Sequence, residues 1–203
     1  MIRDEAFDVV VLGGGPAGLA AAAASAKAGA STLLLERDEV LGGVLRQCVH
    51  DGFGLLKFRE QLAGPEYAYR AAAEFAASGA AARTGAFVLE IRRDARGGFE
   101  LAASSKTEGV RRASARALVL ATGCRERSDR QVFIHGDRPA GIFTAGLAQY
   151  LVNVKGLLPG RRAVILGSGD IGLIMARRLT LEGVDVEGVY EIKAEPSGLA
   201  RNV

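Results

Sequence analysis

The chain has 203 residues, of which 49% are hydrophobic and 24% charged, a composition typical of a folded globular protein and too apolar for general disorder. Its net charge is only +3, and its arginines are scattered without interleaved aromatic residues, which argues against nucleic-acid binding. Two cysteines without a CxxC pair exclude a disulfide scaffold. The charged start is unlike a signal peptide, and the alanine-rich run at 17–28 is too short to span a bilayer, so we expect a cytoplasmic protein with no membrane span.

The first predicted unit is a strand, a glycine-rich turn, a helix and a second strand. Residues 9–12 form a short apolar run typical of a buried parallel strand. Pro16 follows three glycines and suits the first turn of a helix, which Gly29 is placed to end. The second strand covers residues 32–35 and ends at Glu36. This order predicts a βαβ unit of the Rossmann type.

The middle of the chain changes its periodicity. After a loop-rich stretch, residues 66–78 show the spacing of an amphipathic helix. Three strands separated by turn signals follow, with Gly97-Gly98 as a hairpin turn, and they predict an antiparallel meander. The predicted meander strands are 86–92, 98–104 and 109–115, and a separate buried strand is predicted at 117–120.

The last part of the chain repeats the first pattern. A helix is expected near 147–152, and a strand at 163–166 then leads into a second glycine turn. The remaining predicted elements are a helix at 171–181, its cap Gly183, a strand at 184–190 and the acid Glu191. We therefore expect an α/β protein: a Rossmann-like domain with a parallel sheet, helices and a meander, followed by the start of a second Rossmann domain.

The first glycine turn, Gly13 to Gly18, matches the GxGxxG pattern. Gly13 permits the tight turn, Gly15 lets the backbone approach a pyrophosphate, and Gly18 lets helix and strand pack closely. The helix N-terminus offers unpaired N–H groups to phosphates. Glu36 follows at about the 20-residue spacing expected of an acid that binds ribose hydroxyls. The complete set predicts a dinucleotide site.

The second turn, Gly167 to Gly172, is followed by Glu191 at a similar spacing. A carboxylate there accepts hydrogen bonds from a free ribose 2′-OH and repels a 2′-phosphate, so NAD is expected over NADP. Lys193 weakens that preference. A second Rossmann unit can also be purely structural or hold another nucleotide, and the sequence leaves this alternative open.

Taken together, the GGGPAGL turn, the strand-end Glu36, the meander, the Ala121-Thr122-Gly123 strand end and the second GxGxxG resemble the pyridine nucleotide–disulfide reductase-like flavoproteins. The resemblance implies FAD in the first unit and NAD(P)H in the second. It implies an FAD-binding domain over 1–157, lacking its C-terminal return segment, and the first part of an NAD(P)-binding domain over 158–203.

Longer motifs narrow the resemblance. Residues 41–43, 47–54 and 64–67 resemble small flavoprotein subunits that accompany FAD-dependent glycerol-3-phosphate dehydrogenases. The stretch from Arg138 to Gly146 resembles FAD/NAD subunits of amine- and opine-type dehydrogenases and sarcosine oxidases. Both imply a small-molecule redox substrate and, as partner, a second flavoenzyme subunit. The implied FAD contacts are Gly13, Gly15, Pro16, Ala17, Gly18, Glu36, Arg37, Gly42, Gly43, Ala121, Thr122 and Gly123, and the implied NAD contacts are Gly167, Gly169, Asp170, Ile171 and Glu191.

Two features depart from that family pattern. The disulfide reductases carry a redox cysteine pair just after the Gly-Gly, whereas the stretch just after Gly42-Gly43 holds one cysteine, Cys48. Disulfide exchange needs an attacking and a resolving thiol, so a disulfide reductase of that kind is not expected. The Gly-Asp segment that completes the FAD domain in the family has no counterpart before Val203. We therefore expect a C-terminally truncated chain whose activity alone is open.

Candidate catalytic residues are Cys48 and His50, in the loop expected near the flavin, although a packing role is an equal alternative for both. Together with Cys124 and His135 they lack zinc-site spacing, so no metal site is predicted. No GxSxG motif or Walker lysine is present. The sequence thus predicts an FAD-dependent oxidoreductase that transfers hydride between NAD(P)H and FAD. The alternatives are an inactive fragment and a non-catalytic nucleotide-binding or electron-transfer subunit.

Overall fold

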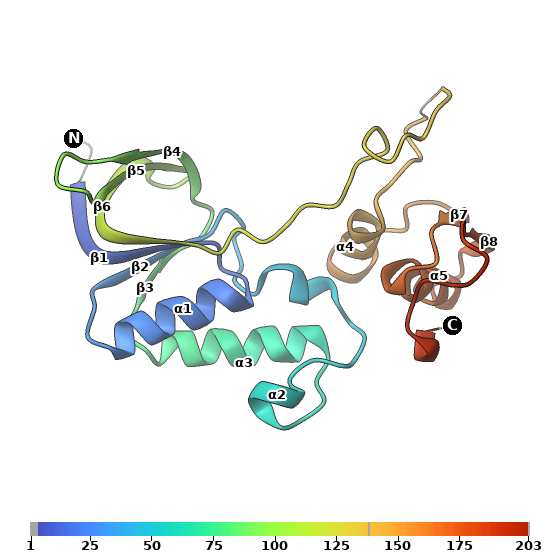
Figure 1. Ribbon diagram of the computed structural model, residues 1–203, viewed down its shortest axis with the longest axis horizontal. Helices are drawn as coiled ribbons and strands as arrows, with labels where there is room; N and C mark the ends of the chain where they lie inside the picture. Colours follow the sequence, from blue (N-terminus) through green and yellow to red (C-terminus); the bar gives the residue numbers. More distant parts are fainter. Residues whose placement is uncertain (1–3, 138, 203) are drawn as a thin grey trace. The chain divides into compact units, whose positions relative to one another are not determined.

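The computed structural model describes residues 4–137 and 139–202, so Arg138, at the start of the stretch that resembles amine- and opine-type subunits, lies outside the described residues. The chain forms two compact units that separate between Cys124 and Arg125 (Figure 1). The domain boundary expected after residue 157 stays a prediction. In the packing of the second unit, helix α4 (Ala145–Lys155) contacts helix α5 (Asp170–Leu181).

A six-stranded sheet with the order β3-β2-β1-β6-β5-β4 forms the first unit. Strands β3, β2, β1 and β6 are parallel, whereas β6, β5 and β4 are antiparallel. The strands are β1 (Asp4–Leu12), β2 (Thr32–Leu35), β3 (Ala81–Arg83), β4 (Phe87–Arg93), β5 (Phe99–Ser105) and β6 (Gly109–Leu120). The predicted combination of parallel sheet and meander is confirmed.

Strand β6 corrects one prediction. The strands expected at 109–115 and 117–120 are one continuous strand, which pairs with β5 from Gly109 to Ala115 and with β1 as far as Leu120. The expected break was wrong because exposed Arg116 interrupts the apolar pattern without interrupting the backbone. One edge of β6 belongs to the meander while the other extends the parallel sheet. Strand β3 was not predicted, since its three residues carry no apolar period.

The unit has three layers because side chains alternate along the parallel strands. Val10, Leu12, Leu33 and Leu35 face the meander and pack with its apolar residues. Val11 and Leu34 point the other way, toward the helices. These strands are therefore buried on both faces, which explains their continuous apolar runs.

Helices α1 (Pro16–Lys27) and α3 (Gly64–Ala76) lie side by side on the second face of the sheet (Figure 1). Helix α3 begins two residues earlier than predicted, where Glu66 Oε2 accepts a 2.9 Å hydrogen bond from the backbone N–H of Ala63. The loop between β2 and α3 contains the 3₁₀ helix η1 (Gly43–Gln47) and the short helix α2 (Leu55–Phe58). Contacts between η1 and α3 hold this loop on the helical layer.

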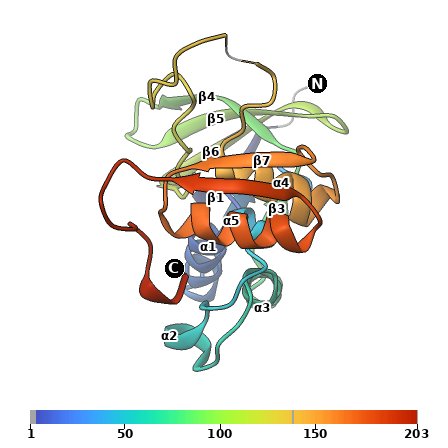
Figure 2. The same cartoon turned by 90° about the vertical axis from the view of Figure 1, so that its right-hand side faces the viewer.

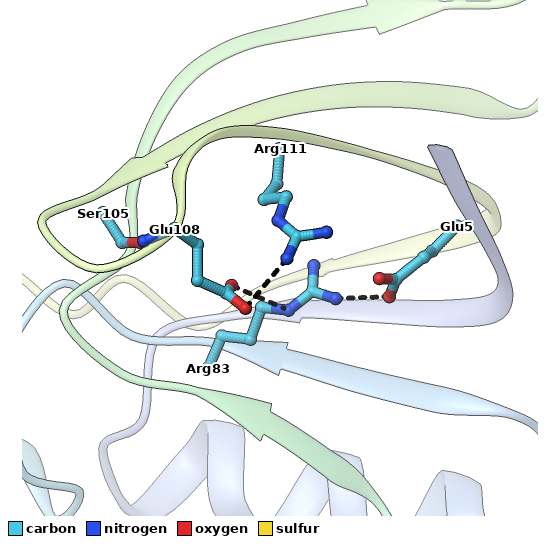
Figure 3. A network of polar contacts seen from close by, with 5 residues as sticks. All are labelled: Glu5, Arg83, Ser105, Glu108 and Arg111. Atoms are coloured by element: carbon cyan, nitrogen blue, oxygen red, sulfur yellow. Dashed lines mark hydrogen bonds and ion pairs between the residues drawn. The ribbon is translucent and has the colours of Figure 1, made fainter. Parts of the chain in front are cut away.

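An ion-pair network ties the meander to the parallel edge of the sheet (Figure 3). The guanidinium of Arg83, on β3, binds the carboxylate of Glu5 on β1 and lies 3.8 Å from that of Glu108 in the β5–β6 turn. Arg111 binds the same Glu108 carboxylate at 3.1 Å. Glu108 also donates its backbone N–H to the hydroxyl of Ser105 at 3.1 Å. The network thus joins β1 and β3 to the β5–β6 hairpin.

The second unit pairs strand β7 (Arg162–Leu166) with strand β8 (Asp185–Tyr190) in parallel, and α5 lies against the pair (Figure 2). Its core consists of Ala148, Val152, Met175, Leu179 and Val184, which join α4 to α5 and to the start of β8. The 3₁₀ helix η2 (Ala200–Asn202) contacts α5. The predicted second strand–turn–helix–strand unit is thus confirmed. No helix in the described ranges is long and apolar enough to cross a membrane.

Candidate dinucleotide-binding sites

Two glycines of the first turn are required by the fold itself. Gly13 has a φ of +105°, and a Cβ there would lie 2.3 Å from the carbonyl oxygen of Ala121. A Cβ on Gly18 would lie 1.8 Å from the carbonyl oxygen of Gly13. Contacts of this length do not occur, so a side chain at position 13 would push the turn away from Ala121, and one at position 18 would push α1 away from Gly13. Their predicted roles in the tight turn and in close helix packing match this geometry.

Gly15 differs from both. Its backbone is extended (φ −74°, ψ −179°), a conformation open to any residue, and it precedes the first residue of α1. A Cβ there would make only an ordinary 3.9 Å contact with the Cα of Gly43. Nothing in the described protein requires glycine at this position. The open space in front of a helix N-terminus is what a bound pyrophosphate needs.

The strand-end acid Glu36 is bound to the turn. Its Oε2 accepts a hydrogen bond from the backbone N–H of Gly14 at 2.5 Å, and its Oε1 accepts one from the N–H of Asp38 at 2.8 Å. The residue is only 8% exposed. A buried carboxylate is costly unless it is hydrogen-bonded, and these two bonds hold it at the turn.

The other predicted FAD contacts flank the same turn, with one exception. The N–H of Gly42 donates to the carbonyl of Gly14 at 2.8 Å, and a Cβ on Gly43 would lie 2.9 Å from the Cα of Gly15. Ala121 and Thr122 follow β6 directly and border Gly13. The structure thus brings together Gly13, Gly15, Pro16, Ala17, Gly18, Glu36, Gly42, Gly43, Ala121 and Thr122, followed by Gly123 with a φ of +69°. The exception is Arg37, whose side chain is 64% exposed, with its Nε 3.9 Å from Asp38 Oδ1.

The second turn reproduces this geometry. Gly167 has a φ of +103°, and a Cβ on Gly172 would lie 2.3 Å from the carbonyl oxygen of Gly167. Gly169 is extended (φ −65°, ψ 165°) and precedes α5, which begins at Asp170 and Ile171. Apart from its chain neighbours, no atom of the described residues lies within 4 Å of the position of its Cβ. The backbone conformation is therefore repeated, and the close contact at Gly18 recurs at Gly172, whereas Gly167 is required by its positive φ and not by a contact like that of Gly13 with Ala121.

Glu191 corresponds to Glu36 but has more partners. As in the first unit, the backbone N–H of the second turn residue, Ser168, donates to one carboxylate oxygen at 3.0 Å, and the N–H two positions after the acid, Lys193, donates to the other at 3.2 Å. The Ser168 and Ser197 hydroxyls donate to Oε2 at 2.5 and 3.1 Å, and the N–H of Ile192 donates to Oε1 at 2.9 Å. These bonds, with that of the Ser168 hydroxyl the strongest, lower the pKa of Glu191 to about 2.

The segment after Glu191 was not recognised from the sequence. Asp170 Oδ1 accepts hydrogen bonds from the N–H of Leu199 at 2.7 Å and from Asn202 Nδ2 at 2.8 Å. Ser168 Oγ accepts the N–H of Ser197 at 2.9 Å. The side chain of Asp170 thus holds its own chain at the second turn. The only signal in the sequence is Ser168 itself, which stands where the first turn has Gly14.

Neither candidate catalytic residue has an activated geometry. Cys48 follows η1, its Sγ lies 3.3 Å from the carbonyl oxygen of Val44, and burial raises the pKa of its thiol, which disfavours the reactive thiolate. His50 Nδ1 lies 2.9 Å from the carbonyl oxygen of Asp51, and its ring centroid is 5.2 Å from that of Phe53. Their catalytic roles stay predictions. Across residues 4–137 and 139–202, no cluster of three or more His, Cys, Asp or Glu side chains is arranged to hold a metal.

Two GxGxxG turns, each closed by a strand-end carboxylate, define the class of proteins with two dinucleotide-binding folds. The family model for pyridine nucleotide-disulphide oxidoreductases matches residues 7–196, and the chain belongs to this family. It is therefore part of a family of flavin-dependent oxidoreductases.

Named relatives agree with this assignment. The chain is 30% identical over 196 residues to an opine oxidase subunit of Agrobacterium tumefaciens (strain Ach5), covering 94% of this chain and 38% of that protein. It is 31% identical over 205 residues to the alpha subunit of sarcosine oxidase from Rhizobium meliloti (strain 1021), covering 91% and 19%. L-proline dehydrogenase from P. horikoshii shares the fold, with a TM-score of 0.75 at 20% identity over 93% of this chain and 36% of that one. The chain thus spans well under half the length of these proteins.

Proposed function

We propose that the chain binds FAD at its first glycine turn and NADH at its second, and that it serves in hydride transfer between the two. The observation that carries this proposal is the repeated hydrogen bond from the second turn residue to the strand-end carboxylate, Gly14 to Glu36 and Ser168 to Glu191. A turn that only linked strand to helix would need no such acid. Two independent copies of the whole arrangement support two nucleotide sites.

The first turn fits the ADP half of FAD. The open face at Gly15 accommodates phosphate oxygens against the N-terminus of α1, and Glu36 is placed to accept the ribose hydroxyls. Gly42, Gly43 and Ala121 line the same turn with little or no side chain, which leaves room for the nucleotide. When bound, FAD supplies the hydride and electron transfer. The protein supplies the binding groups and their orientation.

The second turn favours NADH over NADPH. Because the pKa of Glu191 is lowered to about 2, its side chain is a full negative charge at neutral pH. That charge repels a 2′-phosphate and attracts hydroxyl donors. Lys193 donates its backbone N–H to this carboxylate, which helps to fix the orientation of the acid.

A small-molecule substrate and a partner subunit complete the proposal. Two relatives are named as subunits of opine oxidase and sarcosine oxidase, which supports an amine-type substrate oxidised in a second flavoenzyme subunit. Coupling to glycerol 3-phosphate and a cytoplasmic location stay predictions from the sequence.

The test is the visible spectrum of the purified protein, before and after anaerobic addition of NADH. We expect a flavin spectrum, identification of the released cofactor as FAD, and bleaching by NADH that is faster than bleaching by NADPH. A matched control is Gly169→Ala, which should keep the flavin spectrum and slow the bleaching. A folded, colourless protein that acquires no flavin from added FAD would refute the assignment of the first turn.

A non-catalytic role of the second unit is the second candidate, and one observation favours it. The chain's own groups donate five hydrogen bonds to Glu191, the group expected to bind ribose. In that case the flavin spectrum would appear, but neither NADH nor NADPH would bleach it.

A further inference from the structure

The two strand-end carboxylates differ in how much of their hydrogen-bonding capacity is used. A carboxylate has about four acceptor positions on its two oxygens. Glu36 receives two hydrogen bonds from the described residues, one on each oxygen. Glu191 receives five, three of them on Oε2. The first acid has acceptor positions left for a ribose diol, and the second has none.

We infer that the hydroxyls of Ser168 and Ser197 occupy the ribose-binding positions of Glu191, so that a nucleotide enters the second site by replacing them. This inference rests on the proposed function, which assigns the second turn to a nicotinamide nucleotide. It makes the two serines the residues that determine how tightly, and with what selectivity, that turn accepts a ribose. We call Ser168, Ser197 and Glu191 the serine clasp.

The comparison of the two turns identifies the added groups. Two backbone N–H bonds to the acid are common to both units: Gly14 and Asp38 donate to Glu36 as Ser168 and Lys193 donate to Glu191. Three bonds to Glu191 are extra, those from the Ser168 and Ser197 hydroxyls and from the backbone N–H of Ile192, and only the hydroxyls can rotate away from the acid. Because Gly14 has no side chain, the first turn has no group in the position of the Ser168 hydroxyl.

The clasp can open without unfolding the segment that carries Ser197. The Ser197 N–H donates to Ser168 Oγ, but the backbone of this segment has further anchors, since Leu199 N–H and Asn202 Nδ2 both donate to Asp170 Oδ1. Gly198 packs so closely that a Cβ there would lie 2.7 Å from Leu173 Cδ1. The hydroxyl of Ser197 therefore leaves Oε2 by rotation of its own side chain, at the cost of one 3.1 Å hydrogen bond.

Opening the clasp affects the binding of NADH and of NADPH differently. The ribose hydroxyls of NADH are donors and can take over the bonds that the serines release. A 2′-phosphate is an anion at neutral pH, brings acceptor oxygens instead, and meets the negative charge of Glu191. Opening the clasp should therefore help NADH and leave NADPH binding weak.

The experiment is a binding titration that follows the fluorescence of NADH, on the unaltered protein and on Ser168→Ala and Ser197→Ala. Each variant should bind NADH about threefold to tenfold more tightly, which corresponds to the net contribution of one hydrogen bond. The gain should be smaller for the NADH analogue that lacks the adenosine 2′-hydroxyl, an effect that a general change in folding would not produce. Thr180→Ala is the control, because its Oγ1 donates to the carbonyl of Ala176 at 2.9 Å within α5, away from the turn.

The outcomes separate the inference from the function on which it rests. Binding of NADH by the unaltered protein, with no gain or a loss in the Ser197→Ala variant, would overturn the clasp and leave the proposed function standing. Binding that appears only in the serine variants would support the clasp. Absence of NADH binding in every variant would refute the assignment of the second turn and the clasp with it. Ser197 lies on the exposed side of the clasp, so its variant keeps the test valid if Ser168→Ala, a change at a buried position, fails to fold.

Discussion

Replacing Gly15 by alanine should weaken the proposed binding of FAD without unfolding the protein, whereas Gly13 and Gly18 are required by the fold itself. Two small effects on stability oppose each other. Alanine reduces the conformational freedom of the unfolded chain, which stabilises by roughly 0.4–1 kcal/mol. It is also a poorer residue than glycine immediately before a helix, by a similar amount. Since the new Cβ would make only a 3.9 Å contact, the free energy of unfolding without flavin should change by less than about 1 kcal/mol.

The effect on FAD should be much larger. In the proposed FAD site, a methyl group at Gly15 would stand where the phosphates approach the N-terminus of α1. Loss of one hydrogen bond to a charged group costs about 1.5–3 kcal/mol, so FAD should bind about tenfold to a hundredfold more weakly. The assay combines urea denaturation of the flavin-free protein with a titration of FAD fluorescence. Gly169→Ala is the matched control, because that glycine is also extended and unhindered, and it should weaken NADH binding while leaving FAD binding unchanged.

An unaltered FAD affinity in Gly15→Ala would refute a role of Gly15 in phosphate binding. A flavin-free variant destabilised by several kcal/mol would refute it as well, because the fold would then need glycine at this position. Gly18→Ala should show that second behaviour, since its Cβ would lie 1.8 Å from the carbonyl oxygen of Gly13.

Three further predictions follow from the ion pairs and from the titratable groups. Arg83→Ala should lower the free energy of unfolding by about 1 kcal/mol in urea denaturation. The control is Arg116→Ala, which should not measurably change the free energy of unfolding, because the Arg116 side chain is 85% exposed. Equal effects of the two substitutions would show that the network contributes no stability. Because the pKa of Glu191 lies at about 2 in the fold against 4.5 ordinarily, its ionised form stabilises the protein above pH 4.5, and this contribution is lost as the pH falls toward 2. Glu191→Gln should flatten acid unfolding in that window, and an unchanged acid transition would contradict this. Iodoacetamide at pH 8 should modify exposed Cys124 before Cys48, whose thiol pKa is raised by burial, as peptide mass spectrometry would show.

The sequence by itself determined the two glycine turns, their helices and the acids that follow. These features depend on short-range rules: a positive φ at Gly13 and Gly167, close packing at Gly18 and Gly172, and a short apolar run before each turn. Because each rule acts within a few residues, it can be read from the residue types in order. The meander was predictable for the same reason, since its turns are local.

Only the tertiary structure decided how distant segments meet. The continuity of β6 depends on its having β5 on one edge and β1 on the other, and exposed Arg116 conceals that double pairing in the sequence. The packing of the first turn also depends on a distant residue. Glycine is required at position 13 because the carbonyl of Ala121, 108 residues later, lies against it. The serine clasp joins residues 168, 191 and 197 through side-chain hydrogen bonds that have no sequence period. Long-range hydrogen bonds and steric contacts depend on where the backbone places each group, and residue order alone does not encode that in any local pattern.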